Sequence, residues 1–148
     1  MVAFCYNGLM IQWEFRESCT LNEWLEVAQL RWPGLRGFHV ANENPGRNKA
    51  ERARIGALRR RMGVKSGVCD WFFFCPPDVR IAIELKKPLS AGKAYPSAEE
   101  REWLAFFAQC GFATCVAHGA PEAIDFVVAE LNKKGAGGKS APLDDSPF

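Results

Sequence analysis

The chain has 148 residues, a length that suits one domain, and 48% of them are hydrophobic, which is enough to bury a core and excludes global disorder. Its 19 Lys and Arg stand against 17 Asp and Glu, and the net charge of +2 argues against a protein that binds nucleic acid through overall basicity. The basic residues are unevenly placed, however, because residues 46–66 hold eight of them and a single acidic residue.

The six cysteines lack the CxxC spacing that is typical of a structural zinc site. The first residues lack the basic start and long apolar core of a signal peptide, and no apolar run reaches the roughly 18 residues that a membrane span needs. We therefore expect reduced thiols in a cytoplasmic protein that has no membrane partner.

The first half of the chain predicts two helices and a strand. A helix is predicted over residues 20–31, where Thr20 and Glu23 fit an N-terminal capping box. A short strand is expected over residues 36–41, and we interpret His39 within it as a packed or surface side chain rather than a metal ligand. A polar loop follows, and then a basic helix over about residues 48–62 that ends at Gly63.

The second half predicts a hairpin and two more helices. Residues 70–75 and 79–86 form the hairpin, and the alternation in the second strand places Ile81, Ile83 and Leu85 on one face. A helix over 97–110 begins at Ser97, a strand covers 112–117, and a last helix runs from Pro121 to about residue 131. Residues 133–148 contain few hydrophobic side chains and predict a disordered tail. This order indicates an α/β fold with a small mixed sheet flanked by helices.

The hairpin carries a set of residues suited to metal-dependent chemistry. Asp70 begins its first strand, while Glu84 and Lys86 share one face of the second, so pairing of the strands brings both carboxylates together. A hard divalent cation such as Mg²⁺ prefers oxygen ligands, and the backbone carbonyl of Leu85 offers a third. Lys86 could hold or deprotonate a water molecule, or stabilise a pentavalent transition state. These residues predict phosphodiester hydrolysis.

The alternative is a solvated strand face with a Glu–Lys pair, an arrangement that is common and contributes little. We favour the metal site because the other face of this strand is wholly apolar, the hairpin is central, and the basic helix lies just upstream.

The sequence resembles the VRR-NUC domain, a branch of the PD-(D/E)XK nuclease superfamily, over roughly residues 20–130. The resemblance is carried by Asn-Glu at 42–43 after FHVA, by the basic helix, and by the runs GVKSGVCD at 63–70, IAIELKKP at 81–88 and SAEEREWLAFFAQCGF at 97–112. It implies a metal-dependent nuclease with a restriction-endonuclease-like core. Asp70, Glu84 and Lys86 match its catalytic motif residue by residue.

The resemblance also implies a glutamate on the first helix that leans toward the metal. Glu23 is the first candidate and Glu26 the second, although Glu23 also fits the capping role. Glu43 either touches the site or holds its loop. Two positions depart from the family pattern: Cys69 replaces a common proline, and Glu100 stands where glutamine is frequent. Glu100 either adds negative charge near the metal or serves only as a capping residue.

The basic segment is a candidate surface for gripping phosphates, because backbone contacts from Lys and Arg dominate affinity for DNA. Its alternative is a solvated helix face. The predicted nucleic-acid-binding residues are Arg47, Lys49, Arg52, Arg54, Arg59, Arg60, Lys65 and Lys87.

The resemblance implies a deoxyribonuclease that uses Mg²⁺ or Mn²⁺ in a bacterial host cell and cuts branched DNA, such as four-way junctions or flaps, as a homodimer. One small site cuts one strand, so resolving a junction requires a second copy. Residues 1–19, with Trp13 and Phe15, are the candidate dimer contact. Two alternatives stay open: a catalytically silent DNA-binding module such as a phage inhibitor, and a nuclease that acts on RNA or nicked DNA.

Overall fold

The computed structural model describes residues 12–42 and 45–135; Glu43 and most of the predicted tail lie outside the described residues. The observed order of helices and strands is the one that the sequence predicts. The elements are α1 (Gln12–Arg31), β1 (Arg36–His39), α2 (Lys49–Arg61), β2 (Trp71–Cys75), β3 (Val79–Lys86), a 3₁₀ turn η1 (Leu89–Ala91), α3 (Ala98–Gln109), β4 (Ala113–His118) and α4 (Ala120–Lys133).

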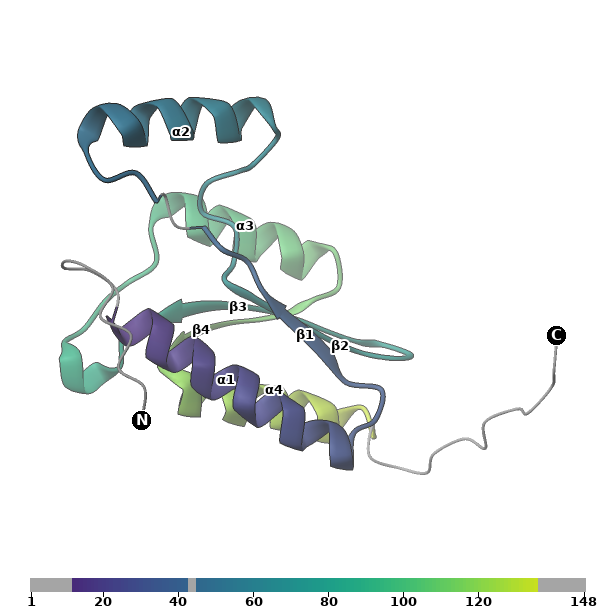
Figure 1. Ribbon diagram of the computed structural model, residues 1–148. Coiled ribbons are helices and arrows are strands. Elements are labelled where there is room, and N and C mark those ends of the chain that lie inside the picture. The colour runs from purple at the N-terminus through teal and green to yellow at the C-terminus, as the bar shows by residue number, and fades with distance from the viewer. Residues whose placement is uncertain (1–11, 43–44, 136–148) are drawn as a thin grey trace, which may run out of the picture.

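The four strands form one mixed sheet in the order β1-β2-β3-β4. β1, β2 and β3 pair antiparallel, whereas β3 and β4 pair parallel through the α3 crossover. Figure 1 shows α1 and α4 on one face of this sheet and α3 on the other. The prediction of a small mixed sheet flanked by helices is therefore confirmed.

Each face of the sheet has its own apolar core. Leu21 of α1, Val127 of α4 and Ile83 of β3 belong to the larger core, and all three are fully buried. Phe72 of β2 belongs to the smaller core, where Phe107 of α3 packs against its ring with a centroid separation of 5.0 Å. The two cores fix the ends of β2 and β3, from which the polar residues of the hairpin project.

The alternation predicted for β3 is confirmed, but its second face is not solvated. Ile81, Ile83 and Leu85 enter the larger core, while Ala82 enters the smaller one. Glu84 shares the face of Ala82 and is only 3% exposed. A solvated Glu–Lys strand pair is therefore wrong for this position, because α3 covers this face of the sheet.

α1 begins at Gln12, so the predicted start at Thr20 is wrong. The Thr20 hydroxyl donates a hydrogen bond to the Arg16 carbonyl at 3.0 Å, one turn earlier within the same helix, instead of capping a helix end. The Glu17 carboxylate accepts a 2.6 Å hydrogen bond from the amide of Ala120, where the α4 N-terminus favours negative charge. Residues 12–19 therefore pack on the domain that was predicted to begin at residue 20.

The starts of α2 and α3 follow the capping signals in the sequence. Asn48 caps α2 by accepting a hydrogen bond from the Glu51 amide, and Ser97 and Glu100 form the complete capping box of α3. α2 contains no buried residue and stands apart from the sheet, above α3 in Figure 1. Its basic side chains are consequently displayed on an isolated helix.

No helix in the described part of the chain has the length and apolar character that crossing a lipid bilayer requires. The five cysteines among the described residues, Cys19, Cys69, Cys75, Cys110 and Cys115, are free thiols.

Candidate active site

A pocket of about 260 Å³ opens where the ends of β2 and β3 meet the N-termini of α1 and α3. Its lining includes the predicted Asp70, Glu84 and Lys86. The complete lining is Trp13, Glu14, Asn42, Gly67, Val68, Asp70, Glu84, Leu85, Lys86 and Glu100. The structure thus brings together at one place residues from five separate segments of the chain.

Asp70 is held at the point where β2 and β3 separate. The last backbone pair of the two strands joins Trp71 to Ile83, and beyond it the Asp70 carboxylate accepts a 2.8 Å hydrogen bond from the amide of Leu85. Asp70 is 7% exposed. The Asp70 carboxylate therefore accepts the hydrogen bond that a neighbouring strand would otherwise accept from Leu85. This contact directs the Asp70 side chain toward the pocket.

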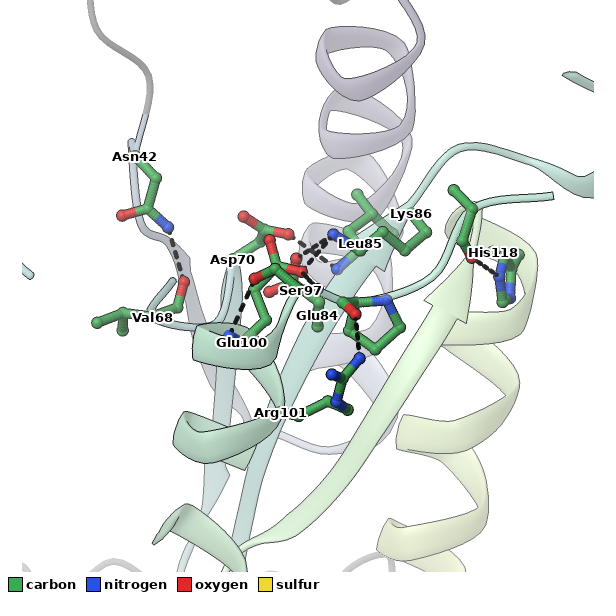
Figure 2. Close-up of polar contacts among 12 residues, drawn as sticks. Asn42, Val68, Asp70, Glu84, Leu85, Lys86, Ser97, Glu100, Arg101 and His118 are labelled. Atoms are coloured by element: carbon green, nitrogen blue, oxygen red, sulfur yellow. Dashed lines mark hydrogen bonds and ion pairs between the residues drawn. The ribbon is translucent and has the colours of Figure 1, made fainter. Parts of the chain in front are cut away.

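Lys86 lies between two carboxylates. Its Nζ is 2.8 Å from Glu84 Oε1 and 2.7 Å from Glu100 Oε2, as the dashed contacts in Figure 2 show. Glu100 also accepts the Ser97 amide at 2.7 Å. Glu100 therefore completes the capping box of α3 and also pairs with Lys86 at the pocket.

The loop before Asp70 is shaped by a glycine and an asparagine. Gly67 has a φ of +73°, and a Cβ at this position would lie 2.8 Å from the Glu99 Cβ, so the loop approaches α3 more closely than another residue would allow. The Asn42 side chain donates a 2.7 Å hydrogen bond to the Val68 carbonyl, which ties the end of β1 to this loop (Figure 2). This packing explains why the run GVKSGVCD requires glycine at position 67.

Burial and charge repulsion alter the ionisation of the two central carboxyl groups. Burial raises the pKa of Asp70 above its ordinary value. Burial, together with the charge of Asp70, raises the pKa of Glu84 to about 8. Without a cation, the pair therefore retains a proton near neutral pH.

The ion pairs that Lys86 makes with Glu84 and Glu100 oppose the effect of burial on the pKa values of Lys86 and Glu100. Burial by itself lowers the pKa of Lys86, but hydrogen bonds to Glu100 and Glu84 outweigh it and leave the pKa raised. Burial by itself raises the pKa of Glu100, but the hydrogen bonds from Lys86 and the Ser97 amide leave that pKa lowered. Lys86 is therefore a cation throughout the neutral range, and Glu100 is an anion.

In the metal-free protein, the free energy of unfolding should fall as the pH rises from about 5 to 8. The pKa of Glu84 is about 8 in the folded protein and about 4.5 in the unfolded chain. Between these values the folded protein holds a proton that the unfolded chain has lost. A state that holds more protons loses stability as the pH rises. Urea denaturation in a chelator at several pH values measures this slope.

Glu84→Gln should flatten the dependence of the free energy of unfolding on pH. The matched control is Glu102→Gln, which makes the same change at an exposed position and should leave the dependence unchanged. Equal slopes in the wild type and in Glu84→Gln would show that Glu84 does not titrate in this window.

The structure does not bring Glu23 or Glu26 to the site. Both side chains are exposed, and neither lines the pocket, whereas Glu14 of the same helix does. The cause is the position of the helix start, because α1 extends to Gln12 and its first turn, not its middle, reaches the pocket. The sequence did contain a pattern that points to Glu14. Glu14, Leu21 and Ala28 are spaced by seven residues and so share one helix face.

The predicted DNA-binding residues fall into two groups. Arg52 and Arg59 donate hydrogen bonds to backbone carbonyls and so attach α2 to the segment before it. Arg52 Nε lies 2.8 Å from the Gly46 carbonyl, and Arg59 Nη2 lies 2.8 Å from the Ala41 carbonyl. The others, apart from the half-buried Lys87, are exposed: Arg47, Lys49, Arg54, Arg60 and Lys65. The side chains of the second group are therefore open to a ligand at the surface.

No family model matches the sequence, and a search of curated proteins finds no match either. Among solved structures, the chain is similar to one described as a VRR_NUC domain protein, with a TM-score of 0.58 and 20% sequence identity. The alignment covers 86% of this chain and 92% of the other. The resemblance carried by the sequence motifs is thus confirmed at the level of structure, and the chain has the VRR-NUC fold.

Proposed function

We propose that this protein is a metal-dependent endonuclease that hydrolyses phosphodiester bonds in DNA. The observation that carries the proposal is the pairing of two buried carboxylates, Asp70 and Glu84, beside a lysine in an open pocket. Burying two acids side by side is unfavourable, and the raised pKa values of both record that cost. A divalent cation offsets it.

The donor set fits Mg²⁺ or Mn²⁺. Asp70 and Glu84 supply carboxylate oxygens, Leu85 lines the same pocket and adds its backbone carbonyl, and hard cations prefer oxygen ligands. When bound there, the cation would lower the pKa of a water molecule and offset charge on the phosphate. The cluster lines a pocket of about 260 Å³, which leaves room for a phosphodiester group.

The protein's own groups would then orient the reactants. Lys86 is a fixed cation 2.8 Å from Glu84 Oε1, a position from which its ammonium stabilises negative charge that develops on the phosphate. Glu100 holds the other side of that ammonium. The Leu85 amide keeps the Asp70 carboxylate directed into the pocket.

The exposed basic residues of α2 supply the surface for the DNA backbone. Replacing Arg54 and Arg60 together with Gln should weaken DNA binding and reduce its salt dependence, by about 0.9 in the log–log slope for each phosphate that the protein no longer neutralises. Fluorescence anisotropy with a labelled duplex over a range of salt concentrations measures the slope.

A matched control removes two charges from the far end of the molecule, at Lys133 and Lys134, which pair with Glu130 and Asp78. This control should keep the wild-type slope. An unchanged slope in the Arg54/Arg60 variant would exclude these two side chains of α2 from the DNA site.

We also propose that two copies act together on branched DNA, since one site of this size cuts one strand. Phe15 is 71% exposed on α1 and directly follows the pocket residue Glu14, so a second copy that docks there would place two sites close together. Sedimentation equilibrium should show a dimer that Phe15→Glu dissociates. The control Leu30→Glu, at a position of the same helix that is 85% exposed, should leave the dimer intact. A monomer at high concentration would contradict the dimer.

A further inference from the structure

We propose that Tyr95 is a stacking platform for an unpaired DNA base beside the pocket, and that Lys87 and Lys93 hold the adjoining phosphates. All three belong to residues 87–97, the segment that joins β3 to α3. This inference rests on the proposed function, because it takes the pocket to hold the phosphate that is cleaved. It deepens that function by naming the substrate feature that the protein selects, a base without a partner strand.

The 87–97 segment runs along the edge of the pocket. It begins directly after Lys86 and ends at Ser97, whose amide donates a 2.7 Å hydrogen bond to Glu100. Lys86 and Glu100 both line the pocket, and Figure 1 shows the segment at the same end of the sheet as the start of α1. Tyr95 precedes Ser97 by two residues, so their Cα atoms are at most about 7 Å apart. The Tyr95 ring is therefore within reach of a nucleotide whose phosphate enters the pocket.

The backbone on either side of Tyr95 is held in place. His118 Nε2 donates a 2.9 Å hydrogen bond to the Ala94 carbonyl. Arg101 donates a 2.7 Å hydrogen bond to the Pro96 carbonyl, and Figure 2 shows both contacts. The Tyr95 side chain is nevertheless 69% exposed. A ring that is anchored at its backbone but uncovered loses little conformational freedom when a ligand stacks on it.

The segment carries positive charge and contains no acidic residue. Lys93 Nζ lies 5.2 Å from the centroid of the Tyr95 ring, a distance at which an ammonium and an aromatic ring attract each other. Lys87 Nζ lies 3.2 Å from the position that a Cβ on Gly92 would occupy, so the Lys87 side chain extends along the segment. An exposed ring with ammonium groups on one short segment matches a nucleotide, which offers a flat base and a phosphate.

Stacking on Tyr95 favours a base that lacks a neighbour on one face. In an intact duplex each base is stacked between its neighbours, and taking it out of the stack is unfavourable. An unpaired base at a flap or a junction avoids most of that cost and can stack on an aromatic side chain whatever its identity. The platform would therefore give a preference for branched DNA without a preference for sequence.

The test compares the affinity of the full chain for a labelled flap with its affinity for the fully paired duplex, by fluorescence anisotropy in chelator. The wild type should prefer the flap, and Tyr95→Ala should reduce that preference by about fivefold to a hundredfold, the usual loss when a stacked aromatic side chain becomes alanine. Tyr95→Phe keeps the ring and should keep the preference. The matched control is Leu89→Ala, which removes an apolar side chain of the same segment that is 56% exposed, and it should behave as the wild type.

A second measurement changes the DNA instead of the protein. Each unpaired nucleotide next to the branch is replaced in turn by an abasic one. At one position the replacement should lower the affinity of the wild type by a similar factor and leave that of Tyr95→Ala unaffected, because the two changes remove the same contact. The wild-type half of this experiment is decisive even if Tyr95→Ala does not fold.

The outcomes separate this proposal from the proposed function. The platform is overturned if Tyr95→Ala keeps the flap preference, if Tyr95→Phe or Leu89→Ala loses it equally, or if no abasic position matters to the wild type. Equal affinity of the wild type for flap and duplex also overturns it. In each of these cases metal-dependent cleavage by the wild type would leave the proposed function standing, whereas a wild type that binds no DNA overturns both.

Discussion

Asp70→Asn should lower the rate of Mg²⁺-dependent DNA cleavage by at least about a thousandfold while leaving the protein folded. Asp70 supplies a carboxylate oxygen to the proposed cation, and metal-ion catalysis lowers the activation barrier by several kcal/mol, where each 1.4 kcal/mol or so is tenfold in rate. Asn preserves the size of the side chain and an oxygen that can accept the hydrogen bond from the Leu85 amide. Single-turnover cleavage of a labelled substrate measures the rate, and calorimetric titration with Mn²⁺ should show the accompanying loss of metal binding.

The matched control is Asp125→Asn, which makes the same change at an exposed position of α4 and should cleave at the wild-type rate. An Asp70→Asn protein that cleaves within about tenfold of the wild type would remove Asp70 from the catalytic machinery.

Lys86→Ala should lower the cleavage rate by about a hundredfold to a thousandfold, the usual loss when one group that stabilises a transition-state charge is removed. It should not lower metal affinity. The Lys86 ammonium lies 2.8 Å from Glu84 Oε1, so its removal takes a positive charge away from the cation position. Asp70→Asn should therefore lose both metal binding and cleavage activity, whereas Lys86→Ala should lose only cleavage activity. A general loss of structure would not produce this difference.

Arg80→Ala provides the comparison for Lys86→Ala, because Arg80 is an exposed cation near the start of the same strand, away from the pocket. It should cleave normally. A Lys86→Ala protein that lost metal binding along with activity would instead indicate that the ion pairs of Lys86 with Glu84 and Glu100 hold the site together.

Local signals in the sequence predicted much of the framework. The apolar and polar alternation of β3 gave the correct two faces, since period-two patterning reflects which side of a sheet is covered. Ser97 and Glu100 predicted the start of α3 because a capping box is a contact between residues three apart. Asp70, Glu84 and Lys86 could be brought together from the sequence because they lie on adjacent strands of one hairpin.

The start of α1 could not be predicted in the same way. Thr20 and Glu23 fit a capping box, but the hydroxyl of Thr20 bonds the Arg16 carbonyl within a helix that is already formed. What extends the helix to Gln12 is tertiary packing, including the contact between Glu17 and the N-terminus of α4, 103 residues further along the chain. Because the helix was predicted to start at Thr20, only Glu23 and Glu26 were considered for the first-helix glutamate, and Glu14 lay outside the predicted helix.

The roles of individual arginines in α2 were equally invisible in the sequence. The sequence predicted only that these arginines lie on a basic helix. Arg59 donates hydrogen bonds to carbonyls of the segment after β1, and this contact depends on how the loop between β1 and α2 folds back. The juxtaposition of Glu14, His39 and Asp70 likewise depends on three elements meeting, and no spacing in the chain encodes it.

The most direct test of the central claim is a cleavage panel with the purified wild-type protein and Asp70→Asn in Mg²⁺, in Mn²⁺ and in chelator. The substrates are linear duplex, flap, four-way junction, single-stranded DNA and RNA. We expect cleavage of DNA by the wild type only when a divalent cation is present, with branched substrates cut fastest, and none by Asp70→Asn. Binding of DNA without cleavage of any substrate under every condition would contradict the account and favour a catalytically silent DNA-binding module.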